Sequence, residues 1–130
     1  MIVLDTQAML FDSLSPSRLS ARARKAIESG CANFELACSD ISLWEIAMAI
    51  ARGRVKPGMD ATQYLNDSIA LRGIRVLPIT AEIAVLSQSD VFSHGDPADR
   101  LIAATACFHR AALVTSDARL RKLKNVTTIW

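Results

Sequence analysis

The amino-acid sequence predicts an α/β fold, in which helices cover both faces of a central, mainly parallel sheet of about five strands. Short runs rich in Val, Ile and Leu alternate along the chain with longer segments whose apolar residues recur every three or four positions. Strand, helix and strand in this order form right-handed crossovers between parallel strands. The 130 residues, 51% of them hydrophobic, suffice for one domain over residues 1–130.

In the first half of the chain, a glycine marks the expected end of each predicted helix, because glycine is common just past helix C-termini. Gly30 and Gly53 follow the first two apolar-periodic segments, and Gly73 follows the third. Strands are predicted where the runs are short and apolar. The elements expected here are the strands Ile2–Leu4 and Leu36–Cys38 and the helices Ser17–Glu28, Ser42–Ala51 and Ala61–Leu71.

The second half repeats the alternation. Its longest helix begins at Pro97, a residue that suits the first helical position, and its small residues allow close packing on a sheet. The elements expected here are the strands Arg75–Ile79, Leu113–Thr115 and Val126–Ile129 and the helices Ala81–Gln88 and Pro97–Arg110.

Composition excludes several classes of protein. Fifteen basic residues against thirteen acidic ones leave a net charge of +2, so bulk charge alone does not indicate nucleic-acid binding. The three cysteines have no C-x-x-C spacing, which argues against a disulfide framework or a thiolate zinc site. No apolar run approaches the ~20 residues of a membrane span, and Asp5 interrupts the N-terminal one at once. We therefore expect a cytoplasmic protein with no membrane partner.

Acidic residues follow the predicted strands. Parallel α/β sheets bind ligands at the carboxyl ends of their strands, where the strand order reverses. Asp5 follows the first strand, Glu45 lies in the helix after the second, and Asp117 follows the fourth. Asp96 and Asp99 open the longest helix. These acids are therefore expected to meet at one edge of the sheet.

Each acid also has an ordinary structural interpretation. Asp5 fits a helix cap or a turn, and Asp117 fits a turn. The sequence Ser42-Leu43-Trp44-Glu45 matches a capping box, with Ser42 as N-cap and Glu45 at the third helical position. Asp96 before Pro97 fits an N-cap.

Considered together, the acids favour a metal site. Carboxylates within ~4–6 Å raise one another's pKa unless a cation lies between them. Oxygen-only ligands favour a hard ion, Mg²⁺ or Mn²⁺, and neither His94 nor His109 shares a zinc-ligand spacing with a cysteine. Such an ion suits hydrolysis of a phosphodiester, because it activates water and stabilises charge on the phosphate oxygens. The number of ions stays open.

Four blocks of the sequence resemble the signature blocks of PIN-domain ribonucleases, and more narrowly those of VapC toxins. The blocks are Ile2–Thr6, Ile41–Ala47, His94–Ala106 and Leu113–Asp117, and the match extends over nearly the whole chain. The resemblance implies a metal-dependent endoribonuclease that cleaves RNA. It also implies that the protein forms a homodimer and is inhibited by a cognate VapB-type antitoxin. A larger toxin–antitoxin assembly is a second possible form of the complex.

The resemblance carries the family's acidic quartet onto this chain. It implies that Asp5 and Asp99 coordinate the principal ion, that Glu45 ligates it or acts through water, and that Asp117 holds a second ion or a water. Thr6, Ser116 and Asp96 would support the site, although Asp96 is equally a helix cap. Two departures from the family pattern are Gln7, in place of Asn or His, and Gly95, in place of Arg.

Basic residues are unevenly distributed. Two acid-free basic runs follow elements that carry Glu45 and Asp117, so their members are candidates to hold RNA phosphates beside the metal. These candidates are Arg52, Arg54, Lys56, Arg119 and Arg121.

Two alternative functions belong to other classes. A phosphoacceptor signalling domain has a similar sheet, but it needs an acceptor Asp after the central strand and a Lys after a later one. Val76–Thr80 supplies no acid, and Asp117 follows the later strand, so this chain lacks both features. The second alternative is a catalytically inactive PIN-like module that binds RNA or protein. All four acids are present, which favours the enzyme. Trp44, beside Glu45, is expected to lie in the core, at a dimer interface or against a base.

Overall fold

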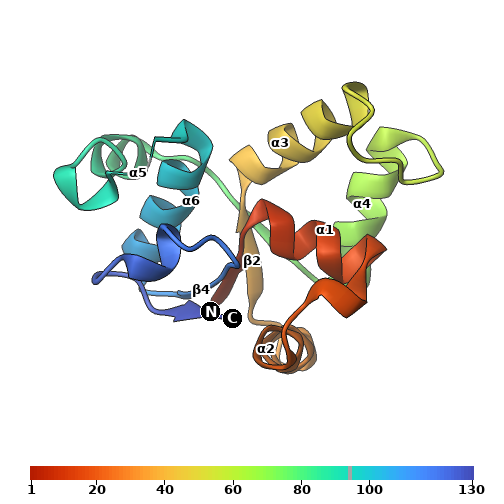
Figure 1. The fold of residues 1–130 in the computed structure, drawn as a ribbon, viewed down its shortest axis with the longest axis horizontal. Coiled ribbons are helices and arrows are strands. Elements are labelled where there is room, and N and C mark those ends of the chain that lie inside the picture. The colour runs from red at the N-terminus through yellow and green to blue at the C-terminus, as the bar shows by residue number, and fades with distance from the viewer. Residues whose placement is uncertain (94) are drawn as a thin grey trace.

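The computed structural model describes residues 1–93 and 95–130, and its centre is a five-stranded sheet in the order β3-β2-β1-β4-β5 (Figure 1). All four strand pairings are parallel. The strands are β1 (Ile2–Leu4), β2 (Leu36–Ser39), β3 (Arg75–Leu77), β4 (Ala112–Val114) and β5 (Thr128–Ile129). The predicted fold class, strand number and strand direction are confirmed.

Six α-helices and three 3₁₀ turns connect the strands within the described residues. The helices are α1 (Thr6–Leu14), α2 (Ala21–Ala32), α3 (Asp40–Ala51), α4 (Ala61–Arg72), α5 (Ala81–Leu86) and α6 (Pro97–Phe108). The 3₁₀ turns are η1 (Pro16–Arg18), η2 (Asp90–Phe92) and η3 (Leu120–Lys122).

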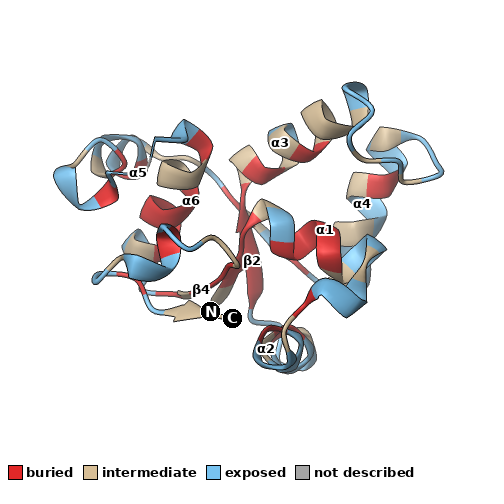
Figure 2. Cartoon of the chain, viewed as in Figure 1, coloured by how far each residue is buried: buried red, intermediate tan, exposed pale blue. Residues whose placement is uncertain are grey.

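The sheet separates two hydrophobic cores, because successive side chains of a strand point to opposite faces. Leu4 belongs to the core that α1, α2 and α4 cover, whereas Val3 belongs to the core that α5 and α6 cover. Figure 2 shows the buried residues along the strands and on the helix faces turned toward them. Helices therefore cover both faces, as predicted.

The strand order reverses at β1, which lies between β2 and β4. Leu4 is in register with Cys38 on one side and with Val114 on the other, so β1 and β4 end at the same level and β2 ends one residue beyond it. The residues that follow these strands therefore face one another across the carboxyl edge of the sheet, where α/β folds place their ligands.

No helical range was predicted for α1, although a helix cap was one of the two interpretations of Asp5. Four consecutive residues, from Ala8 to Phe11, are buried, so the segment shows no helical stripe of apolar and polar residues. The helix forms where Asp5 caps it: the Asp5 side chain accepts a hydrogen bond from the Ala8 backbone N–H. This helix places Thr6 and Gln7 directly beside the end of β1.

The prediction that a helix spans Ser17–Glu28 was wrong at both ends. Residues 16–18 form η1, and α2 begins after Ser20, whose side chain accepts from the Ala23 N–H. The helix also continues through Gly30. A Cβ at Gly30 would lie 2.5 Å from Cδ2 of Leu36, so this glycine permits close packing of α2 on β2 rather than ending the helix.

Candidate active site

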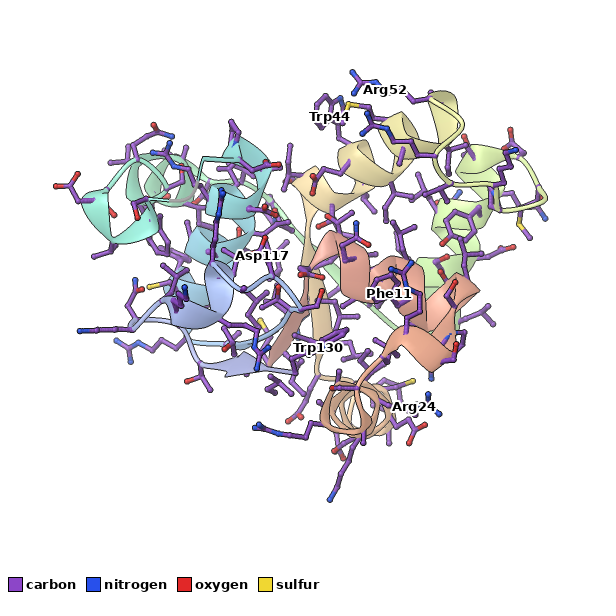
Figure 3. The ribbon with its side chains drawn as sticks, viewed as in Figure 1. Phe11, Arg24, Trp44, Arg52, Asp117 and Trp130 are labelled. Carbon is purple, nitrogen blue, oxygen red and sulfur yellow. The ribbon has the colours of Figure 1, made fainter. Side chains whose placement is uncertain are left out.

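The four predicted acids, Asp5, Glu45, Asp99 and Asp117, line one cleft of about 270 Å³. They come from four places in the fold: the end of β1, helix α3, the first turn of α6 and the segment after β4. The supporting residues Thr6, Asp96 and Ser116 line the same cleft, as does Gln7. Asp117 is labelled in Figure 3 near the middle of the molecule.

Asp5 is the most buried member of this acidic cleft, with 4% of its surface exposed. Its Oδ1 accepts a hydrogen bond of 2.6 Å from the Ala8 N–H, so the side chain also caps α1. Burial raises the pKa of Asp5 to about 6, and the negative charges of Asp117 and Glu45 contribute to this rise. Hydrogen bonds from Thr115 and Ala8 act in the opposite direction.

Glu45 does not belong to a capping box, so that prediction was wrong. Helix α3 begins at Asp40 after Ser39, which places Ser42 and Glu45 inside the helix. Glu45 Oε1 instead accepts a 2.5 Å hydrogen bond from Thr6 Oγ1, which also lies 3.2 Å from the Oγ of Ser42. Burial, aided by the charge of Asp96, raises the pKa of Glu45, and the Thr6 hydrogen bond opposes this effect.

Asp96 and Asp99 lie at the N-terminus of α6. Asp96 Oδ1 accepts hydrogen bonds from the backbone N–H groups of Ala98 (2.8 Å) and Asp99 (3.4 Å), and Pro97 takes the first helical position. The predicted N-cap is confirmed. Asp99 is half-buried in the first turn. His94, the first residue of the third sequence block, lies outside the described residues.

Asp117 holds the backbone that follows β4. Its Oδ1 accepts hydrogen bonds from the N–H groups of Arg119 (2.7 Å) and Leu120 (3.1 Å), which fixes the start of η3. Asp117 therefore shapes a turn, as predicted, and lines the acidic cleft as well.

Thr115 links two of the acids, a role that was not predicted from the sequence. The residue is fully buried, its side chain hydrogen-bonds to Asp5, and its Oγ1 accepts from the Asp117 N–H at 3.0 Å. The only signal in the sequence was its position as the last residue of a predicted strand, which indicates burial but no bonding partner.

The donor chemistry of the acidic cleft fits a hard divalent ion, because the ionisable side chains that line it within residues 1–93 and 95–130 are all carboxylates. The raised pKa of Asp5 has burial as its largest cause, and two neighbouring carboxylates add to it; an opposing cation would relieve their repulsion. Within residues 1–93 and 95–130, no three Asp, Glu, His or Cys side chains already form a metal-binding group.

A larger groove of about 680 Å³ adjoins the acidic cleft and shares Thr6, Gln7 and Glu45 with it. Four cations line this basic groove: Arg18, Arg52, Arg54 and Lys56. Three of them were predicted as phosphate contacts. Arg18 was not, and its guanidinium carbon lies 4.2 Å from the ring centre of Phe11. Phe11 and Arg52 are both labelled in Figure 3.

The other predicted cations lie on the segment after Asp117. Arg119 borders a separate hollow, and Arg121 is exposed on η3. Trp44, one residue before Glu45, is 58% exposed, so it does not lie in the core. None of the helices in the described part of the chain is long and apolar enough to cross a membrane.

This chain is similar to known proteins over nearly its whole length. Residues 2–126 match the model of the PIN domain family. The chain is 36% identical to Ribonuclease VapC22 of Mycobacterium tuberculosis over 132 residues, which cover 99% of this chain and 98% of that protein.

Two solved structures share the fold over 98% of this chain. One is VapBC2 from Rickettsia felis bound to a promoter DNA fragment, with a TM-score of 0.72, 20% identity and 97% of that chain covered. The other is FitAcB from Neisseria gonorrhoeae, with a TM-score of 0.69, 22% identity and 96% covered. The family match over residues 2–126 and the identity to VapC22 show that this chain belongs to the PIN-domain family.

Proposed function

We propose that this chain is a VapC-like endoribonuclease that hydrolyses RNA phosphodiester bonds with Mg²⁺ or Mn²⁺. The observation that carries the proposal is the convergence of Asp5, Glu45, Asp99 and Asp117 on one cleft beside a basic groove. The likeness to Ribonuclease VapC22 supports RNA as the substrate.

Asp5, Glu45, Asp99 and Asp117 would hold the ion. When bound, a divalent ion there would lower the pKa of water and stabilise negative charge on the phosphate oxygens. Thr6 keeps the carboxylate of Glu45 oriented toward the acidic cleft, and Thr115 does the same for Asp5. These hydrogen bonds also favour the ionised carboxylates, the form that binds a cation.

The basic groove would bind the RNA backbone. Arg52, Arg54 and Lys56 follow the end of α3, the helix that carries Glu45, so phosphates held there lie next to the acidic cleft. The basic groove would thus bind the RNA backbone through its cations, whereas the acidic cleft would bind the metal ion through its carboxylates.

The partners of this protein are also proposed from its relatives. A structural neighbour contains VapB together with VapC, which supports a VapB-type antitoxin as the inhibitor. We further propose that the protein forms a homodimer and assembles with the antitoxin into a larger complex. We also propose that it resides in the cytoplasm, where cellular RNA is translated.

The test is cleavage of total RNA by the purified protein with Mg²⁺ or Mn²⁺, followed by mapping of the cut ends. We expect cleavage that a chelator abolishes and that Asp5→Asn lacks while remaining folded. If Asp5→Asn cuts at the wild-type rate under matched Mg²⁺, the assignment of the acids is wrong. If the wild-type protein cuts no RNA with either ion, the inactive RNA- or protein-binding module replaces the enzyme.

A further inference from the structure

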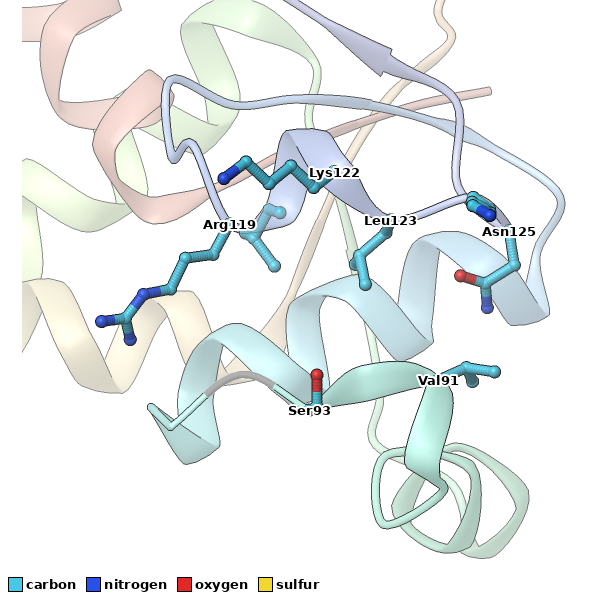
Figure 4. A pocket seen from close by; sticks show the side chains of 8 residues that line it. Val91, Ser93, Arg119, Lys122, Leu123 and Asn125 are labelled. Atoms are coloured by element: carbon cyan, nitrogen blue, oxygen red, sulfur yellow. The ribbon is translucent and has the colours of Figure 1, made fainter.

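A third hollow, of about 470 Å³, lies between η2 and the segment from Arg119 to Asn125. Figure 4 shows this η3 groove with Val91 and Ser93 on one wall and Lys122 and Leu123 on the other. Its size is typical of pockets that take a small organic ligand. The acidic cleft and the basic groove do not include it.

Among the residues that the structure describes, every ionisable residue lining the η3 groove is a cation. Arg119, Lys122 and Lys124 are all exposed, and within the described residues none of them forms an ion pair with a carboxylate. Val91 and Leu123 add apolar surface between the charges, and Val91 is 52% exposed. A hollow with cations around apolar walls fits a nucleotide, because phosphate meets the charges and the base meets the apolar surface.

The chain segment that begins at Asp117 connects the η3 groove to the acidic cleft. Asp117, which lines the cleft, accepts hydrogen bonds from the backbone of Arg119 and Leu120, which line the groove. A Cβ at Gly95 would lie 3.8 Å from Nη1 of Arg119, so this guanidinium reaches the segment that leads into Asp96. In Figure 4, Arg119 and Asn125 lie at opposite ends of the groove.

The two cationic hollows adjoin the acidic cleft from different layers of the fold. The basic groove is lined by α1, α3 and the segments after them, whereas the η3 groove lies with Leu120 and Leu123 over the other core. A strand whose scissile phosphate occupies the acidic cleft therefore meets cations in both directions.

We infer that the η3 groove is a nucleotide-binding subsite for the RNA strand next to the scissile phosphate. The inference rests on the proposed ribonuclease function. It assigns Lys122, Lys124 and Val91 to substrate binding and explains how the protein engages nucleotides on both sides of the cut, as an internal cleavage requires. An acidic protein segment is the competing occupant, but continuity with the acidic cleft favours the substrate.

The test measures binding apart from cleavage. In an Asp5→Asn background with Mg²⁺, fluorescence anisotropy follows a labelled, randomised single-stranded RNA of about twelve nucleotides, within the size range of single-strand sites. The test variant is Lys122→Ala/Lys124→Ala. Its control is Arg22→Ala/Lys25→Ala, which removes the same charge from exposed positions of α2.

We expect the Lys122/Lys124 variant to bind RNA at least about tenfold more weakly, because two cations no longer meet the phosphates. The slope of log affinity against log salt should fall by about 0.7 for each phosphate that the variant leaves without a cation. Val91→Glu should weaken binding similarly, whereas Val85→Glu, at a 74% exposed position of α5 outside the groove, should not. The Arg22/Lys25 control should bind within about twofold of the parent.

Equally weakened binding in the test and control variants would overturn the inference, because bulk charge would then explain both. Unchanged RNA binding combined with abolished binding of labelled polyglutamate would overturn it in favour of an acidic protein segment. Failure of the wild-type protein to cleave RNA would refute the proposed function, but the binding comparison would still decide whether the groove takes RNA.

Discussion

Thr6 Oγ1 donates a 2.5 Å hydrogen bond to Glu45 Oε1, although the two residues are 39 positions apart. The bond joins the first residue of α1 to the second turn of α3 across the acidic cleft. It explains why a threonine directly after Asp5 matters: its hydroxyl fixes a carboxylate that comes from a different strand–helix unit.

Replacing Thr6 by valine should lower the cleavage rate by about tenfold, the cost of one hydrogen bond to a charged group. Without this bond the pKa of Glu45 rises further, because Thr6 is what opposes its rise, so the effect should be largest at acidic pH. Single-turnover cleavage from about pH 5 to 8 measures both effects. Thr6→Ser, which keeps the hydroxyl, serves as control. A valine variant with the wild-type rate and pH profile would contradict this role.

The stability of the metal-free protein should fall as pH rises through 6. Asp5 has a pKa of about 6 in the folded chain against 3.8 ordinarily, so the folded state binds this proton more tightly. The corresponding stability is fully present below about pH 3.8 and is lost as pH rises through about 6. The difference in pKa corresponds to at most about 3 kcal/mol.

Asp5→Asn isolates this effect, since asparagine still caps α1 but does not ionise. Urea unfolding at several pH values should show the wild-type protein losing stability relative to the variant between about pH 4 and 7. Added Mg²⁺ should restore stability to the wild-type protein at about pH 7 more than to the variant. A constant difference in unfolding free energy between the two proteins across this pH range would show that ionisation of Asp5 does not destabilise the folded state.

Local patterns in the sequence predicted the sheet well and the hydrogen bonds of the site poorly. The apolar runs at Ile2–Leu4 and Leu36–Cys38 lie in strands because both faces of the sheet are covered, so their hydrophobicity alone indicated them. The Asp96 cap was predictable because its partners are two and three residues away.

Non-local partners were not predictable in the same way. Ser42 and Glu45 have the spacing of a capping box, yet Glu45 accepts a hydrogen bond from Thr6 on another helix. No local sequence pattern indicates that contact. The role of Thr115 depends likewise on Asp5, which only the parallel pairing of β1 and β4 brings near. Gly30 is the residue type expected just past a helix end, but here glycine is required because Leu36 lies too close to leave room for a side chain.

Helix α1 is tied to α4 by an ion pair whose two members differ in exposure. Arg72 donates two hydrogen bonds, of 2.8 and 2.7 Å, to the carboxylate of Asp12. The Asp12 side chain is 9% exposed and that of Arg72 is 35% exposed. Loss of the arginine therefore leaves a buried charge, whereas loss of the carboxylate leaves a cation that can reach water.

Arg72→Met should thus cost about 2 to 3 kcal/mol of unfolding free energy, and Asp12→Asn only about 1 kcal/mol. Methionine keeps most of the packing of the arginine stem, so the comparison reports charge rather than volume. Urea denaturation measures each value. The double variant should be more stable than Arg72→Met alone, because it removes the uncompensated carboxylate. Equal costs for the two single variants would mean that burial of Asp12 does not govern the pair.

Charge removal in the basic groove should weaken RNA binding without changing the chemistry of the acidic cleft. Arg52 and Arg54 lie at and just beyond the end of α3, exposed and beside the cleft that contains Glu45. Arg52→Ala/Arg54→Ala should raise the KM for RNA by about tenfold or more, while kcat changes little, because these arginines would hold phosphates away from the reacting bond. The salt slope of binding should fall by about 0.7 for each phosphate left without its arginine. Steady-state cleavage at several salt concentrations measures both quantities, with Arg22→Ala/Lys25→Ala as the matched control. A drop in kcat with unchanged KM would instead place these arginines at the reacting phosphate.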